Sequence, residues 1–236
     1  VNVALKGGEM NMMTGNDGLY SFGDLPFGNS YTVEARKNDD FLNGVSTLDL
    51  VMIQRHILDI ERLNSPYKLI AADVNNDKTI TASDLTELRK LILGVTTKFD
   101  KNDSWKFFDK SYQFIDPLNA HKEDLPLVYD IENIKNDMLI NFTGIKIGDV
   151  NGNVVANANN EATDSRSSNR LMLSTENQNF EAGQTVEVPV VLAQDNEVAG
   201  FQFTVNFDTE LFSLVAINSD LPSINDQNFG FTRLAN

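Results

Sequence analysis

Residues 73–84, with the sequence DVNNDKTITASD, place oxygen-bearing side chains at alternate positions and end on an acid. Ca²⁺ binds about six to eight oxygens, and a loop of about twelve residues surrounds it when positions 1, 3, 5, 7, 9 and 12 point inward. In this frame the predicted ligands, with Thr79 acting through its carbonyl, are Asp73, Asn75, Asp77, Thr79 and Asp84. The alternative is an Asx-rich turn that caps the next helix without metal. The spacing favours calcium.

Position 6 of this loop is Lys78, whereas calcium loops of the EF-hand type have glycine there. That position requires a left-handed backbone, which costs a non-glycine residue about 1 kcal/mol. We therefore expect a strained backbone at Lys78 and an apolar contact from Ile80, two residues later, to the core beneath the loop.

A second candidate loop lies upstream, because residues 45–58 and 80–93 align without a gap. The alignment superimposes Asp49 on Asp84 and indicates an internal duplication. Counting back from Asp49 gives a second predicted ligand set, with Gly44 acting through its carbonyl: Asn38, Asp40, Gly44 and Asp49. Position 5 is Leu42, which cannot bind a cation through its side chain. The site is either degenerate or uses Asp39 or Asn43 through a shifted backbone.

Each of these loops precedes an amphipathic segment. Apolar residues recur at helical spacing in residues 47–60 and 83–95, and Gly94 stands where a helix is expected to end. We therefore predict one helix after each loop.

A third loop opening occurs at residues 147–153, IGDVNGN, where Asp149, Asn151 and Asn153 alternate. Its twelfth position is Asn160, which is not an acid. We expect a turn there rather than a complete metal loop.

Two calcium loops, each followed by one helix and neither preceded by the leading helix of an EF-hand, resemble the dockerin fold. Residues 73–94 match the dockerin repeat closely, and residues 38–58 match it loosely. The resemblance implies two Ca²⁺ ions and a cohesin-bearing partner. The partner would contact helix faces that include Thr47, Leu48, Arg55, Ala82, Ser83, Arg89 and Lys90. The Ser-Thr pair of many dockerins is not kept, so the choice of partner stays open.

Residues 1–37 read as short strands separated by turns, and Asp17-Gly18 is a strong hairpin signal. The segment TGNDGLYSFGDLPFGNSYTV, residues 14–33, resembles the closing strands of transthyretin-like sandwich modules of the CnaB or carboxypeptidase-regulatory-like type. Only the last strands of such a module are covered, so we expect an earlier part to precede them.

Alternating apolar and polar residues return after residue 170, in TVEVPVVLA (185–193) and GFQFTVNFD (200–208). Such alternation is typical of strands with one face in a sandwich core. The segment resembles the first half of a cohesin-like jelly-roll sandwich. The residues that carry this resemblance are Gly183, Val186, Val188, Gly200, Phe203, Phe207, Asp208 and Leu211.

The predicted fold is therefore multi-domain and mainly β. It combines a partial transthyretin-like β-sandwich, a duplicated calcium loop-helix (dockerin-like) module and a partial cohesin-like jelly-roll sandwich. The boundaries are 1–37 for the first module, 38–96 for the dockerin-like module, 97–152 for an extension packed on it, 153–169 for a linker and 170–236 for the cohesin-like part.

Composition disfavours several functions. The net charge is −15, from 34 acids against 19 bases, which disfavours nucleic acid and anionic membranes as partners. The chain has no cysteine, and His56 and His121 lack sequence neighbours for a zinc site or a catalytic triad. The longest apolar run is far below the roughly 18 residues of a membrane helix. We expect no membrane insertion and no enzymatic activity.

The sequence favours a calcium-stabilised structural section of a large bacterial surface or secreted protein, such as an adhesin stalk, a filament or a scaffold. Millimolar extracellular calcium and a micromolar Kd would add about 4 kcal/mol of stability. Its partners would be neighbouring domains, other copies in a homo-oligomer, or a cohesin-like protein. The alternatives are a dockerin-type assembly module that binds a cohesin, and an accessory region of a secreted hydrolase.

Overall fold

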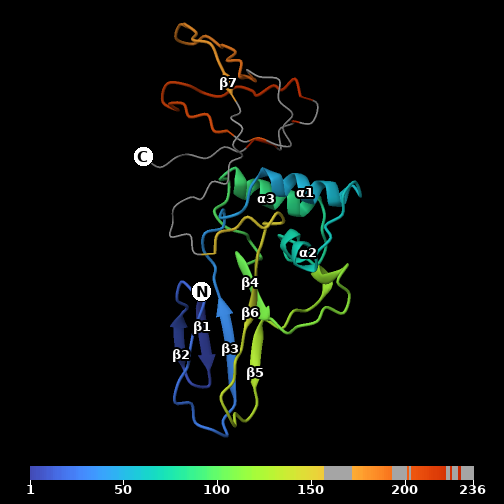
Figure 1. Ribbon diagram of the computed structural model, residues 1–236. Helices are drawn as coiled ribbons and strands as arrows, with labels where there is room; N and C mark the ends of the chain where they lie inside the picture. The colour runs from blue at the N-terminus through green and yellow to red at the C-terminus, as the bar shows by residue number, and fades with distance from the viewer. Residues whose placement is uncertain (157–171, 193–200, 202, 222–223, 225–227, 230–236) are drawn as a thin grey trace.

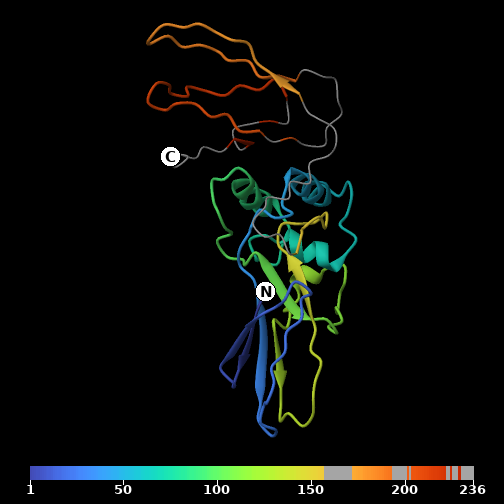
Figure 2. The ribbon, with the colours of Figure 1, turned by 60° about the vertical axis from the view of Figure 1, so that its left-hand side comes forward.

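The computed structural model describes residues 1–156, 172–192, 201, 203–221, 224 and 228–229. Figures 1 and 2 show a sheet at one end, a helical block farther along and residues 172–192 and 203–221 beyond α1 and α3. In the described residues, no helix has the length and apolar character needed to cross a membrane.

The sheet at the N-terminal end is antiparallel and has the order β2-β1-β3-β5. Its strands are β1 (Asn2–Lys6), β2 (Met10–Met13), β3 (Tyr31–Arg36) and β5 (Val128–Ile131). Alternate residues of β1 and β3 are buried, as expected for strands with one face on a core. This small core contains Val3, Leu5, Tyr31, Val33, Ala35, Ile131 and Ile134.

The predicted turn at Asp17-Gly18 is present, with Gly18 at φ +78° and its N–H donating to the Gly15 carbonyl at 3.0 Å. Residues 19–22 form no strand after it. Tyr20 instead donates its hydroxyl to the Ile140 carbonyl at 2.8 Å, and Tyr20 and Phe22 pack against the sheet core. Aromatic packing rather than strand pairing holds this segment.

The helical block contains α1 (Thr47–Ile57), α2 (Pro66–Ala72) and α3 (Ala82–Ile92). Helices α1 and α3 confirm the two predicted helices, and the Gly94 N–H donates to the Leu91 carbonyl at 3.0 Å, at the predicted stop. Sequence analysis missed α2. Its start has a recognisable signal, because Ser65 is the N-cap and proline follows in the first turn.

A two-stranded antiparallel sheet, β4 (Trp105–Asp109) with β6 (Phe142–Lys146), and the short helix η1 (Ala120–Lys122) complete the block. The segment after β6 enters the same core as the helices. Buried members of this core include Val45, Ile53, Leu69, Ile70, Leu88, Leu91, Phe108, Ile145, Ile147 and Val150. Residues 145–150 are therefore an integral part of the helical block rather than a peripheral tail.

The extension also reaches the N-terminal sheet. Its strand β5 pairs with β3, with Tyr31 opposite Ile131. The Ser104 N–H donates to Asn38 Oδ1 at 2.9 Å, and Asn38 Nδ2 donates to Asp103 Oδ1 at 2.6 Å. The sheet and the helical block are thus joined by strand pairing and by side-chain hydrogen bonds.

The described part of residues 172–221 contains only two short paired strands, β7 (Leu173–Ser174) and β8 (Val191–Leu192). The prediction of long strands at 185–193 and 200–208 is wrong for the described residues. Several apolar side chains of the pattern are exposed: Val188, Phe203, Phe207 and Leu211. A sandwich strand buries its apolar face only against a facing sheet, and the described residues form no such pair here. Gly200 and most of the predicted linker, residues 157–169, lie outside the described residues.

Candidate metal centres

In the loop at residues 73–84, acidic and amide side chains accept hydrogen bonds from the loop's own backbone N–H groups. Asp73 accepts from the N–H of Asp77 at 3.0 Å and from that of Lys78 at 3.1 Å. The Asp77 N–H also donates to Asn75 Oδ1 at 3.0 Å. Lys78 has φ +65°, which confirms the expected left-handed backbone, and Ile80 packs against the core as expected. These bonds join Asp73, Asn75 and Asp77, although no three acidic or histidine side chains of the described residues converge as a metal-binding group.

Helix α3 positions the acid that closes the loop. Asp84 lies in the first turn, where its Oδ2 accepts from the Thr81 N–H at 2.9 Å. Its Oδ1 accepts from the Asn75 N–H at 3.1 Å. One carboxylate therefore caps the helix and holds the third residue of the loop.

Two carboxylates of this loop are buried, Asp73 with 2% of its surface exposed and Asp84 with 0%. Burial raises the pKa of Asp73 to about 6 and also raises the pKa of Asp84. Among the described residues, no ion pair involves either carboxylate, and Lys78 pairs outside the loop with Asp124. The charge of Lys106, whose Nζ donates to Asn76 Oδ1 at 2.6 Å, also acts on Asp73 and partly offsets this rise. Two buried carboxylates beside one lysine that forms no ion pair with them still fit a bound cation.

The second predicted ligand set is divided in the structure. Asn38 and Asp40 are exposed, and Asn38 bonds to Ser104 and Asp103, as described above. Asp49, the closing acid of that set, has 0% of its surface exposed and bonds elsewhere. The structure therefore shows no hydrogen bond that joins Asn38 or Asp40 to Asp49 within the described residues.

Asp49 accepts hydrogen bonds from a segment about a hundred residues later in the chain. Its Oδ1 accepts from the N–H of Val150 at 2.9 Å and from that of Asn151 at 3.1 Å. Its Oδ2 accepts from the Ser46 N–H and hydroxyl, both at 2.9 Å. Burial raises the pKa of Asp49 to about 6, despite these bonds.

The Asp149 carboxylate accepts hydrogen bonds from the backbone N–H groups of the residues that follow it. Its Oδ1 accepts from the Gly152 N–H at 2.7 Å, and its Oδ2 accepts from the Val154 N–H at 3.0 Å. Asn43 then brackets Val155, because its Oδ1 accepts the Val155 N–H at 3.2 Å and its Nδ2 donates to the Val155 carbonyl at 2.9 Å. Residues 149–155 therefore lie against residues 43–49, the later part of the upstream segment.

Gly44 lets the backbone at Val154 pack directly against the upstream segment. A Cβ added at Gly44 would lie 2.7 Å from the Val154 Cα and 2.9 Å from its nitrogen. Gly44 also has φ +76°. Only glycine fits both constraints, since backbone atoms cannot move aside as a flexible side chain can.

Gly44→Ala should therefore lower the unfolding free energy by more than about 2 kcal/mol, which combines left-handed strain of about 1 kcal/mol with displacement of Val154. Urea unfolding of the full chain measures it. The matched control is Gly18→Ala, because Gly18 has a similar φ of +78° and an added Cβ would meet open space. Equal losses in the two variants would contradict the close contact.

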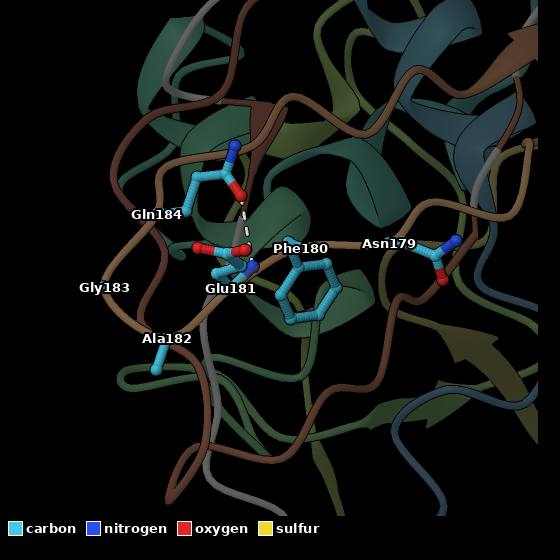
Figure 3. Close-up of a pocket in the computed structure, with 6 residues that line it drawn as sticks. All are labelled: Asn179, Phe180, Glu181, Ala182, Gly183 and Gln184. Atoms are coloured by element: carbon cyan, nitrogen blue, oxygen red, sulfur yellow. Dashed lines mark hydrogen bonds between the residues drawn. The ribbon is translucent and has the colours of Figure 1, made fainter.

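A surface hollow and the two histidines were candidate sites for chemistry. The hollow in Figure 3 is bounded by a single turn, residues 179–184, where the Glu181 N–H donates to Gln184 Oε1 at 3.1 Å. Of the two histidines, His56 uses Nδ1 to accept the Leu63 N–H at 3.2 Å, which is a packing role. Burial lowers the pKa of both His56 and His121.

Comparisons with known families agree with two of the resemblances. The family model of the type I dockerin domain matches residues 40–93, and that of the cohesin domain matches residues 172–234. No curated protein and no solved structure matches the chain. Type I dockerin domains bind calcium, so the match supports Ca²⁺ as the cation. Asp149 lies outside the matched residues, and the transthyretin-like module stays a prediction.

Proposed function

We propose that this chain is a calcium-stabilised structural section of a larger bacterial surface or secreted protein and has no catalytic role of its own. The dockerin and cohesin domains support a role in assembly or as a scaffold, because both domains mediate protein–protein interaction and occur in extracellular or cell-surface proteins. Calcium would fix the fold of the helical block, with Asp73, Asn75, Asp77, Asp84 and the Thr79 carbonyl as ligands.

The observation that carries this proposal is the continuity between the helical block and the N-terminal sheet. Strand β5 comes from the extension that packs on the helices, yet it completes the sheet through its pairing with β3. The Asn38 side chain bonds to the stretch just before β4. A module joined to its neighbour in this way transmits force as one body, which suits a stalk, a filament or a scaffold.

The second candidate is a dockerin-type module that docks on a cohesin-bearing partner. It is favoured by helix positions that stay exposed, Leu48 and Arg55 on α1 and Ser83 and Lys90 on α3. Leu48 is an apolar side chain with 44% of its surface exposed. Such a surface is available to a partner. An accessory region of a secreted hydrolase remains a third proposal, and the sequence that flanks residues 1–236 would test it.

Unfolding of the full chain in calcium tests the leading proposal. We expect the fluorescence of Trp105, in β4, and amide exchange in β1 and β3 to report the same transition, because β5 couples the sheet to the block. A sheet that unfolds at a lower denaturant concentration than the block would contradict a single rigid section. Binding of a purified cohesin in calcium but not in chelator would favour the second candidate.

A further inference from the structure

The backbone around Asp149 repeats the backbone around Asp73. In each segment the first acid accepts the N–H groups of the fifth and sixth residues: Asn153 at 3.3 Å and Val154 at 3.0 Å for Asp149, and Asp77 and Lys78 for Asp73. In each, the third residue accepts the N–H of the fifth, from Asn153 to Asn151 and from Asp77 to Asn75, both at 3.0 Å. Residues 149–154 therefore have the hydrogen bonding of the first half of a calcium loop.

The second half of that loop comes from the 38–49 segment. Asp49 accepts the Asn151 N–H at 3.1 Å, as Asp84 accepts the Asn75 N–H at 3.1 Å. Asp49 also accepts the Ser46 N–H at 2.9 Å, as Asp84 accepts that of Thr81 at 2.9 Å. Asp49 thus occupies the closing position for a loop opening that lies about a hundred residues away.

Three further positions also correspond, whereas the sixth differs, because Lys78 has a positive φ and Val154 does not. Val150 and Val74 follow the first acid and are both fully buried. Gly152, at φ +77°, corresponds to Asn76, at φ +58°. Gly44 precedes Ser46 by two residues, as Thr79 precedes Thr81, so its carbonyl takes the place of the Thr79 carbonyl in this order.

The buried carboxylates of Asp49 and Asp149 would be stabilised by a bound cation. Asp49 is fully buried and Asp149 has 7% of its surface exposed. Among the described residues, no ion pair reaches either carboxylate. Lys146 is also buried and its charge interacts with Asp40 and Asp149, but its Nζ donates to the Phe41 carbonyl at 2.8 Å rather than to either carboxylate of the site. The hydrogen bonds to Asp49 and Asp149 come from backbone and uncharged side-chain donors, as they do in the Asp73–Asp84 loop.

We propose that the first calcium site of this chain is assembled from two separate segments, with the ligands Asp149, Asn151, Asn153, the Gly44 carbonyl and Asp49. This inference rests on the proposed function. It keeps Gly44 and Asp49 from the ligand set expected for a contiguous loop and replaces Asn38 and Asp40. The ion clamps the segment after β6 to the start of α1.

The split site should bind calcium more weakly than the contiguous loop. It supplies two carboxylates, Asp149 and Asp49, where the other loop supplies three, and calcium affinity follows the charge of the ligands. Calorimetric titration of the chelator-stripped full chain with CaCl₂ should therefore show two ions with separate affinities.

The ligand assignment is tested by stoichiometry. Asp149→Ala and Asp49→Asn should each remove the weaker ion and leave the tighter one, whereas Asp40→Asn should leave both. Asp84→Asn should remove the tighter ion. Amide exchange gives a second readout, because calcium at the weaker site should protect Val150–Val154 and Val45–Ser46 together.

A gain-of-affinity variant guards against misfolding. Asn153→Asp gives the split site the carboxylate that Asp77 supplies in the other loop, and it should tighten the weaker ion about tenfold. The matched control, Asn141→Asp at an exposed position outside both loops, should leave both affinities unchanged.

The outcomes separate this inference from the proposed function. Two ions lost in the pattern above support the split site. Loss of the weaker ion in Asp40→Asn but not in Asp149→Ala overturns it in favour of a contiguous loop. A single ion that depends on Asp84 overturns the split site and leaves calcium stabilisation intact, and no bound calcium overturns both.

Discussion

Replacing millimolar calcium by a chelator is expected to lower the unfolding free energy of the full chain by about 4 kcal/mol for each site with a micromolar Kd. The reason is the burial of Asp73, Asp84 and Asp49, whose carboxylates form no ion pair among the described residues. Without the ion, this buried charge is offset by hydrogen-bond donors and, at Asp73, by the nearby charge of Lys106. With it, the ion adds binding free energy to the folded state alone.

Urea unfolding followed by the fluorescence of Trp105, the only tryptophan, measures this difference. Trp105 lies in β4, within the block that calcium stabilises. The control replaces calcium by magnesium at equal ionic strength, since Mg²⁺ requires octahedral geometry and retains its water. Equal midpoints in calcium and in chelator, with equal slopes, would exclude a structural role for the ion.

The contiguous loop could be predicted because all of its determinants are local. Asp73, Asn75, Asp77 and Asp84 lie within one stretch of chain, and Asp84, which closes the loop, lies in the first turn of α3. The same locality made α1 and α3 predictable from the spacing of their apolar residues. Local chemistry therefore fixes both the loop and the helix that orients it.

The partners of Asp49 could not be predicted in this way, because spacing along the chain does not show contacts between residues a hundred positions apart. Two signals were nevertheless present. The upstream loop has Leu42 at a ligand position, and the loop opening at Asp149 has Asn160 where an acid should close it. The upstream loop lacks a ligand in its first half, and the loop at Asp149 lacks the acid that closes its second half. Two loops that are incomplete in opposite halves indicate one site built from both.

Strand β5 was missed for a similar reason. Residues 128–131 pair with β3, and the partner of a strand depends on the tertiary path of the extension rather than on the strand's own pattern. In residues 172–221 the apolar alternation was read correctly as a pattern, and the family match supports a cohesin domain. Alternation predicts which face can be buried, whereas burial itself needs a facing sheet.

The two sites should differ in when they form. The contiguous loop needs only residues 73–84 and the first turn of α3, so it can bind calcium in a partly folded chain. The split site needs residues 44–49 and 149–154 to meet, and contacts between distant parts of a chain form slowly. Calcium binding at the split site should therefore occur only after the whole helical block has folded.

Asp84→Asn is expected to destabilise the chain by about 4 kcal/mol in millimolar calcium if the ion at this site has a micromolar Kd, and to change its stability little in chelator. In calcium the variant loses a charged ligand. In chelator it removes a buried charge, whose burial raises the pKa of Asp84, while the amide oxygen still accepts from Asn75 or Thr81. Urea unfolding of both proteins in both conditions gives the coupling between residue and ion. The matched control is Asp137→Asn, an exposed acid that should show no coupling. A loss of similar size with and without calcium would mean that Asp84 serves only as a helix cap.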